Sequence, residues 1–339
     1  MTISEPLTSL AALVLAAALS AGITWAIHPL LQRYALARPN ARSSHRIPTP
    51  QGGGIAVIAA ALSVAGLAAG LMGFTLPLVL FGATVFIALV GMIDDIRPIP
   101  VLPRLLLQAA AVGAVIYAAP GDLRITPALP LAVERGLLLL AGLWFVNLVN
   151  FMDGLDLMTV AEVVPATGAL ILLSWLDHFQ GLPALVATAL CGAMLGFAPY
   201  NRPVAKVFLG DVGSLPIGLL LGWCLLHLAW QQHLIAALLL PLYYLADATL
   251  TLFRRIARRE PFWAAHRSHF YQRATDNGFG VSQVVGEVFA LNVVLAALAM
   301  ASVTGSAAAG AASLLAGAIA VALVLFHFSR RRPPDSDSS

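Results

Sequence analysis

Charged residues are scarce in this chain. Only 10% of its 339 residues are Asp, Glu, Lys or Arg, against about 25% in ordinary soluble domains. No hydrophilic stretch exceeds about thirty residues, which is too short to form a separate soluble domain. Hydrophobic residues make up 60% of the chain and recur in runs of about 18 or more residues, a length that crosses a bilayer. The composition predicts an integral membrane protein embedded in a lipid bilayer.

Cysteine is also rare, and the net charge is small. Cys191 and Cys224, the chain's 2 cysteines, lie inside apolar segments, where isolated cysteines behave as small core residues. Neither a disulfide framework nor a cysteine metal site follows from them. The net charge of +3 says little about partners, because membrane topology explains the basic residues better. We expect no nucleic-acid partner.

Apolar windows predict eleven membrane-spanning helices joined by short loops. The first apolar run is too long for a signal peptide and follows Glu5 rather than basic residues, so we expect a retained span. The chain should therefore be an all-α polytopic membrane protein, with one transmembrane domain over 1–329 and a charged, disordered cytoplasmic tail over 330–339. The expected spans are residues 8–30, 53–71, 75–93, 104–119, 131–149, 158–176, 183–199, 214–230, 234–253, 282–302 and 306–328.

The basic residues predict the orientation. Seventeen of the 19 lie in alternate loops or the tail, and only Arg124 and Arg135 lie on the other side. By the positive-inside rule the basic side is cytoplasmic. With an odd number of spans, the N-terminus is then periplasmic and the C-terminus cytoplasmic. The loop after the first span carries four of these arginines: Arg33, Arg38, Arg42 and Arg46.

Five aspartates share the cytoplasmic side, at span ends or in short loops: Asp94, Asp95, Asp153, Asp156 and Asp211. One interpretation is that they are solvated charges balancing arginines, which suits a loop residue such as Asp276. The five are instead flanked by apolar residues and glycines. That setting favours a shared functional site.

Two segments carry polar groups in a regular pattern. Asn147, Asn150, Asp153 and Asp156 recur at every third position, which on a helix and its terminal turn should place all four on one side. Their oxygens suit Mg²⁺, which usually takes one or two carboxylates plus substrate phosphates. In the second segment, 208–214, glycines flank Asp211 at the start of a span, where backbone N–H groups suit an anion.

Three further features are less specific alone. Asp94 and Asp95 are adjacent, so their side chains should point in different directions and have different roles. Residues 48–54 form a rigid turn followed by glycines, typical of a loop closing onto a helix. The segment 266–273 has two histidines three residues apart, but no third ligand lies nearby for zinc. Histidines among arginines favour phosphate recognition there, over a merely basic loop; the residues are His266, Arg267, His269 and Arg273.

Together these segments resemble the polyprenyl-phosphate N-acetylhexosamine-1-phosphate transferases, glycosyltransferase family 4. Residues 147–156 are similar to the family pattern N-x-x-N-x-x-D-G-x-D, and residues 208–214 to F-x-G-D-x-G-S. The resemblance extends from Pro48 to Arg273. It implies a Mg²⁺-dependent enzyme of the bacterial inner membrane whose active site faces the cytoplasm. Such an enzyme transfers an N-acetylated sugar-1-phosphate from a UDP-sugar to undecaprenyl phosphate and releases UMP.

The resemblance also implies roles for the metal and phosphate side of the site. Asp211 looks like the Mg²⁺ ligand, with Mn²⁺ as an alternative ion, and Asn150 lies close to the metal and the pyrophosphate. Asp94 and Asp95 match an acidic pair that engages the lipid phosphate or the metal. Whether the reaction is a single or a double displacement is left open.

On the donor side, Asn147, Asp153 and Asp156 match pyrophosphate- and nucleoside-side positions. The expected catalytic residues are four aspartates: Asp94, Asp95, Asp153 and Asp156. Phe208 resembles the ring that stacks on uracil, and Asn201 matches a nucleotide-contacting asparagine. His266, Arg267, His269 and Arg273 fall in the loop that recognises the sugar of a UDP-N-acetylhexosamine.

The chain departs from better-known members in two places. Leu157-Met158-Thr159 replaces a Gly-Leu-Ala run, and the segment 266–273 differs from the His-Ile-His-His form of the N-acetylglucosamine enzymes. This loop resembles the branch that initiates O-antigen, a lipopolysaccharide component, with N-acetylated 6-deoxyhexosamines.

Other interpretations stay open. A secondary transporter of an anionic substrate would carry its ionisable groups near the bilayer midplane, often with an inverted repeat; no repeat is visible, but Asp247 lies inside a predicted span. Asp247 could pair with Arg254 or Arg255, or belong to a lipid-phosphate site. The many small residues could serve packing within the chain or the seam of a homodimer.

Overall fold

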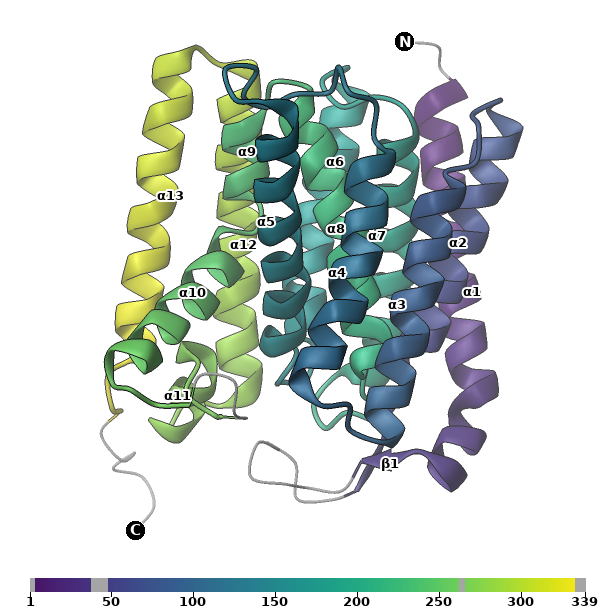
Figure 1. Cartoon of the computed structure of the whole chain (residues 1–339). Coiled ribbons are helices and arrows are strands. Elements are labelled where there is room, and N and C mark those ends of the chain that lie inside the picture. The colour runs from purple at the N-terminus through teal and green to yellow at the C-terminus, as the bar shows by residue number, and fades with distance from the viewer. Residues whose placement is uncertain (1–3, 38–47, 262–265, 333–339) are drawn as a thin grey trace.

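The computed structural model describes residues 4–37, 48–261 and 266–332, and every structural statement below concerns these ranges. They form a helical bundle with one short hairpin (Figure 1). The helices are α1 (Ser4–Tyr34), α2 (Gly54–Leu71), α3 (Leu78–Ile96), α4 (Val101–Ala118), α5 (Leu131–Met152), α6 (Met158–Trp175), α7 (Leu182–Asn201), α8 (Asp211–Trp230), α9 (Leu234–Leu239), α10 (Leu242–Ala257), α11 (Phe270–Asp276), α12 (Val281–Thr304) and α13 (Ala307–Phe328); the strands are β1 (Leu36–Ala37) and β2 (Thr49–Pro50).

Ten helices in the described ranges are long and apolar enough to cross a membrane: α1 to α8, α12 and α13. Backbone groups within a bilayer must be satisfied inside the structure, which helices achieve on their own. The predicted all-α polytopic class is therefore confirmed. Cys191 and Cys224 are buried free thiols, as their apolar surroundings indicated.

The predicted span 234–253 is wrong as a single helix. α9 ends at Leu239 and α10 begins at Leu242, with Pro241 between them. Proline lacks an N–H donor and its ring clashes with the preceding turn, which breaks a helix. Figure 1 shows α9 upright and α10 oblique, leading to α11 at one end of the bundle. The chain still passes between the two ends here, as the eleven-span topology requires, but through two short helices.

Small residues serve packing inside the bundle. A side chain at Gly192 or Gly196 of α7 would overlap the backbone of α1, at Leu13 and Ala17 respectively. α7 and α8 are also the most buried of the ten spans. This contact accounts for two of the small residues considered for a dimer seam, and the homodimer stays a prediction.

The candidate site lies at the end of the bundle where α3 ends and α8 begins, with the β1–β2 hairpin beside it (Figure 1). β1 pairs antiparallel with β2. Residue Gln51, directly after β2, forms an isolated bridge to Phe208, so the predicted loop 48–54 closes onto the segment before α8. Two predictions lie outside the described residues: the basic residues Arg38, Arg42 and Arg46, and the tail from residue 333 onward.

Candidate functional site

Two glycine contacts set the position of α8. Gly91 of α3 lies against the backbone of Asp211, so that a Cβ at Gly91 would overlap the Asp211 carbonyl. Gly54, at the start of α2, meets Gly213 in the same way. Only glycine permits so close an approach of two backbones. The α3 contact lies one turn before Asp94 and Asp95, and it therefore brings that pair to the first turn of α8.

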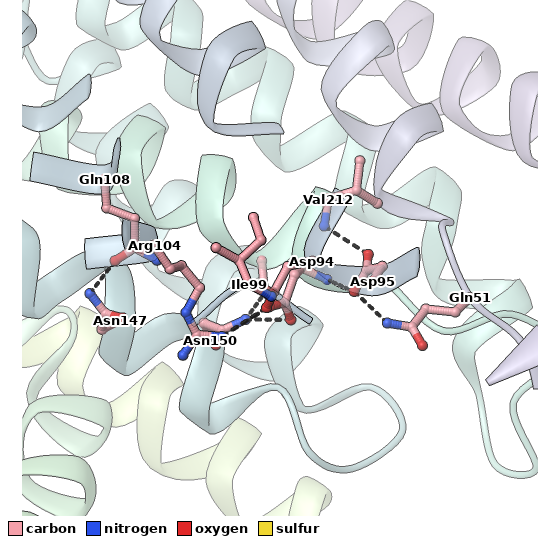
Figure 2. Close-up of polar contacts among 11 residues, drawn as sticks. Gln51, Asp94, Asp95, Ile99, Arg104, Gln108, Asn147, Asn150 and Val212 are labelled. Carbon is pink, nitrogen blue, oxygen red and sulfur yellow. Dashed lines mark hydrogen bonds and ion pairs between the residues drawn. The ribbon is translucent and has the colours of Figure 1, made fainter. Parts of the chain in front are cut away.

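Asp95 occupies the N-terminus of α8 (Figure 2). Its Oδ1 accepts a hydrogen bond from the Asp211 N–H (2.9 Å), and its Oδ2 accepts one from the Val212 N–H (3.1 Å). Gln51 donates through Nε2 to Oδ1 (2.5 Å). A carboxylate is stabilised by the unpaired N–H groups and the dipole of a helix start. The anion predicted for this position is thus the protein's own carboxylate.

Asp94 points elsewhere, as expected for the adjacent residue. Its Oδ1 accepts from the Ile99 N–H (2.6 Å) and its Oδ2 from Nη1 of Arg104 (2.8 Å). The same Nη1 lies 3.9 Å from Oδ2 of Asp211. Arg104 is a site residue that the sequence indicated only as a topology signal, because its contacts depend on how α4 packs beside α3.

Asn150 joins the end of α5 to the start of α8. Its Nδ2 donates to Oδ1 of Asp211 (2.7 Å) and to Oγ of Ser214 (2.9 Å). The cluster of Asp94, Asp95 and Asp211 thus has three carboxylates and one guanidinium, that of Arg104. With all three carboxyls ionised the cluster would carry two net negative charges, which a divalent cation would balance.

The donor set fits Mg²⁺. Asp211 offers a carboxylate and Asn150 an amide oxygen, which are the hard ligands that Mg²⁺ accepts. Within the described ranges no three His, Cys, Asp or Glu side chains converge to hold a metal by themselves. Mg²⁺ commonly completes its coordination with water and substrate phosphates, so the cluster suits an ion that binds together with substrate.

Helix spacing places only Asn147 and Asn150, of the four residues 147, 150, 153 and 156, on one side of α5. Helix α5 ends at Met152, and the chain then turns, so the later two side chains leave the helix register. Asn147 is buried and donates to Oε1 of Gln108 on α4 (2.7 Å). Asn150 therefore contacts Asp211, whereas Asn147, one turn earlier on α5, contacts Gln108 of α4 (Figure 2).

Asp156 and Asn201 hold the segment before α8. Oδ2 of Asp156 accepts from the Ala205 N–H (3.0 Å). Oδ1 of Asn201 accepts from the Leu157 N–H (2.7 Å), and its Nδ2 donates to the Val207 carbonyl (3.0 Å). Both side chains are buried, and together they position Phe208. The nucleotide contacts predicted for Asp156, Asn201 and Phe208 stay predictions.

Asp153 is only half-buried, and its Oδ1 accepts from the hydroxyl of Thr159 (2.5 Å). Burial raises the pKa of Asp153 to about 7; the Thr159 hydrogen bond lowers it, while the charges of Asp95 and Asp156 raise it. A carboxyl group with a pKa this close to neutral can gain or lose a proton in the working pH range. Thr159 stands where the expected family pattern has alanine.

Asp247 anchors α11, which corrects both interpretations left open for it. The side chain is fully buried. It accepts from Nδ1 of His269 (3.3 Å) and from the N–H groups of Phe270 (2.9 Å) and Tyr271 (3.1 Å). A carboxylate at a helix N-terminus is stabilised in this way. Asp247 is therefore neither paired with Arg254 or Arg255 nor open to a lipid phosphate.

The other residues of the predicted recognition loop are less buried. Nδ1 of His266 lies 2.8 Å from Oγ of Ser268, and Nη2 of Arg267 lies 3.3 Å from Oδ1 of Asp276. Arg267 and Arg273 line a cavity of about 280 Å³. Tyr271 donates through its hydroxyl to the Phe151 carbonyl (2.9 Å), which ties α11 to the end of α5.

Comparison with known proteins now decides the family. A model of glycosyl transferase family 4 matches residues 77–229. The chain is 28% identical over 327 residues to a decaprenyl-phosphate N-acetylglucosaminephosphotransferase of Mycobacterium tuberculosis. That alignment covers 85% of this chain and 80% of the mycobacterial protein. The chain belongs to glycosyl transferase family 4.

Two further relatives agree. A probable undecaprenyl-phosphate N-acetylglucosaminyl 1-phosphate transferase of Bacillus subtilis is 27% identical over 304 residues, 79% of this chain and 80% of that protein. A phospho-N-acetylmuramoyl-pentapeptide-transferase of Bartonella quintana is 29% identical over 173 residues, 46% of this chain and 47% of that protein. Membership of this family favours a membrane phosphotransferase over a transporter. The family match includes Asp94, Asp95, Asn150 and Asp211 but ends before α10 and α11.

We predict that Gly91→Ala impairs activity without altering any side chain of the site. The added Cβ would meet the backbone of Asp211, and that backbone can yield only if α8 shifts. Because a misplacement of about 1 Å can cost a hundredfold in rate, kcat for phosphosugar transfer to polyprenyl phosphate should fall by about that factor. The control is Gly82→Ala on the same helix, where a Cβ meets nothing within 4 Å; equal loss in both variants would contradict the contact's role.

We predict that Thr159→Val moves the acid limb of the pH–kcat/KM profile to higher pH. The hydroxyl stabilises the charged form of Asp153, so its removal raises a pKa that is already about 7. The charged form is then lost at a higher pH as the medium is acidified. Asp153→Asn should abolish this limb, and a limb unmoved in Thr159→Val would argue that Asp153 does not titrate in the reaction.

Proposed function

We propose that this chain transfers an N-acetylated sugar-1-phosphate from a UDP-sugar to undecaprenyl phosphate, releasing UMP, at the cytoplasmic face of a bacterial inner membrane. The observation that carries the proposal is the gathering of Asp94, Asp95, Asp211 and Asn150 at the start of α8. Phosphoryl transfer needs positioning and charge neutralisation more than covalent help, and this cluster is built for both.

The acceptor phosphate can act as its own nucleophile. A phosphate monoester has a second pKa near about 6, so it is mostly a dianion at neutral pH. One of its oxygens attacks the β-phosphorus of the donor, the bond between that phosphorus and the UMP oxygen breaks, and UMP leaves with the electron pair. No proton is consumed, so a general base is not required.

The contacts of the acidic pair favour this single displacement. Both oxygens of Asp94 already accept hydrogen bonds, from Ile99 and Arg104. Both oxygens of Asp95 accept backbone N–H groups of α8. A carboxylate whose two oxygens both accept hydrogen bonds is a poor nucleophile. We therefore propose that Asp94 positions Arg104 and that Asp95 positions α8, and that neither forms an aspartyl intermediate.

Asp211, with Asn150, would hold Mg²⁺, or Mn²⁺ in its place. Such an ion neutralises charge that develops on the transferred phosphoryl group and the leaving group. Arg104 beside Asp94 adds a fixed positive charge at the same place. Asp153, Asp156 and Phe208 belong to the adjoining loops, and Asn201 ends α7 beside them; we propose that the nucleotide binds there.

For the sugar, we propose an N-acetylated 6-deoxyhexosamine, and a role in initiating an O-antigen-like surface polysaccharide. The support is the chain's departure from the N-acetylglucosamine pattern at residues 157–159 and 266–273. Thr159 contacts Asp153 directly, so this departure reaches the candidate site. His266, Arg267 and Arg273 are the proposed sugar-side contacts.

The decisive assay incubates membranes containing the protein with undecaprenyl phosphate, Mg²⁺ and a panel of labelled UDP-N-acetylhexosamines. We expect lipid-soluble label, highest with a 6-deoxy sugar, and none with a chelator. Loss of a metal ligand removes several kcal/mol of stabilisation, so Asp211→Ala should lower the rate about a thousandfold. Asp122→Ala, an exposed aspartate in the loop after α4, is the control. The absence of lipid-soluble label with every sugar in the panel, or label undiminished in Asp211→Ala, would refute the proposal.

A further inference from the structure

A carboxyl group that the proposed reaction does not use lies inside the bundle. Glu162, one turn after the start of α6, is fully buried. Its Oε2 accepts a hydrogen bond from Nδ2 of Asn292 on α12 (2.8 Å). Asn292 is only 2% exposed, so the two side chains form a polar contact between two membrane spans. Polar groups in such a place are costly unless each finds a partner.

A proline fixes the orientation of Asn292. Pro165 lies inside α6 and has no N–H, so it cannot donate to the carbonyl four residues earlier, that of Ala161. Nδ2 of Asn292 fills this gap, because it also donates to the Ala161 carbonyl (2.9 Å), as neighbouring helices do for freed backbone groups in membranes. Nδ2 thus faces two acceptors, and turning the amide over would place its oxygen against them.

Two acceptor atoms are left over in this contact. Oε1 of Glu162 and Oδ1 of Asn292 are both buried, and neither has a hydrogen-bond partner in the described part of the chain. If Glu162 is ionised, both atoms are acceptors and neither can serve the other. A proton on Oε1 turns that oxygen into a donor, whereas the amide oxygen remains an acceptor. One proton can therefore satisfy both atoms.

The charges around Glu162 indicate the same protonation state. α6 packs against α1, α5, α7, α8 and α12, and the ion pairs of the described residues include none with Glu162. Glu162 also interacts with Tyr244 of α10, but this phenol brings no positive charge, and its hydroxyl donates to the Met158 carbonyl (3.0 Å). A water molecule could donate to both leftover oxygens, yet the carboxylate charge would stay unbalanced. A buried carboxyl group without a counter-charge takes up a proton instead.

We propose that Glu162 is a neutral carboxylic acid in the working protein, and that its O–H donates to Oδ1 of Asn292. The acid and the amide then join α6 to α12 by two hydrogen bonds without burying a charge. The same turn of α6 is held from α10 by Tyr244, and it carries Thr159, whose hydroxyl donates to Asp153. Glu162 is thus a positioning residue, which holds the start of α6, and through it Thr159, at the border of the candidate site.

Infrared spectroscopy detects the proton directly. A protonated carboxyl group has a C=O stretching band that is separate from the bands of a carboxylate. At neutral pH, the difference spectrum between purified wild-type protein and Glu162→Gln should contain this band. The matched control is Glu287→Gln on α12, a glutamate whose side chain is 30% exposed, and its difference spectrum should lack the band. Absence of the band from the Glu162→Gln difference spectrum would overturn the proposal.

Thermal unfolding separates a neutral acid from a charged one. Glu162→Gln keeps the length of the side chain with one donor and one acceptor, so the unfolding midpoint should stay near that of the wild type. Glu162→Asp keeps the carboxyl group but is shorter and leaves buried groups of Asn292 unpaired, so the midpoint should fall by about 5 °C. The rate of phosphosugar transfer should likewise fall in Glu162→Asp and be retained in Glu162→Gln.

Two outcomes of the unfolding experiment would contradict the proposal. If Glu162→Gln is less stable than Glu162→Asp, or fails to fold, the contact requires a charge. If Na⁺, compared with choline, raises the midpoint of the wild type but not that of Glu162→Gln, a cation rather than a proton occupies the contact. The infrared and unfolding measurements need no substrate, so this inference and the proposed function fail separately.

Discussion

The contact on which the site depends is that of Asp95 with the first two N–H groups of α8. A helix start presents unpaired donors and a partial positive charge, and α3 supplies the carboxylate that satisfies them. The contact is possible only because Gly91 and Gly54 let neighbouring backbones approach the first turn of α8. Asp94, Arg104 and Asp211 lie around that turn. A membrane protein thereby builds a polar site at the edge of an apolar bundle.

The fold was largely predictable because the bilayer restricts it. The length of the apolar runs predicted the spans, whereas the break at Pro241 did not follow from the sequence. Proline alone is no signal, since Pro29, Pro165 and Pro216 each lie inside a continuous helix. The break also places Asp247 at the start of α11, where it accepts two backbone N–H groups. That role requires the loop to fold back, which local spacing cannot show.

The site was predictable only in part. The family resemblance indicated Asn150 and Asp211 as neighbours, and the structure joins them by a hydrogen bond. It could not indicate that Asn147 turns to Gln108 and that Asp156 holds a neighbouring loop, because α5 ends between them. Arg104 and Thr159 were missed for the same reason: their partners are set by tertiary packing. Function thus rests on a few residues whose types are visible in the sequence and whose partners are not.

The account's central claim is that Asp211 binds the cation and Asp95 positions Asp211. Electron paramagnetic resonance of Mn²⁺, titrated into purified protein with UDP-sugar present, tests it directly. The account predicts one bound Mn²⁺ that is lost in Asp211→Asn. In Asp95→Asn, where a supporting contact is removed, affinity should fall about 10- to 100-fold. Mn²⁺ affinity equal to the wild type in both variants would contradict it.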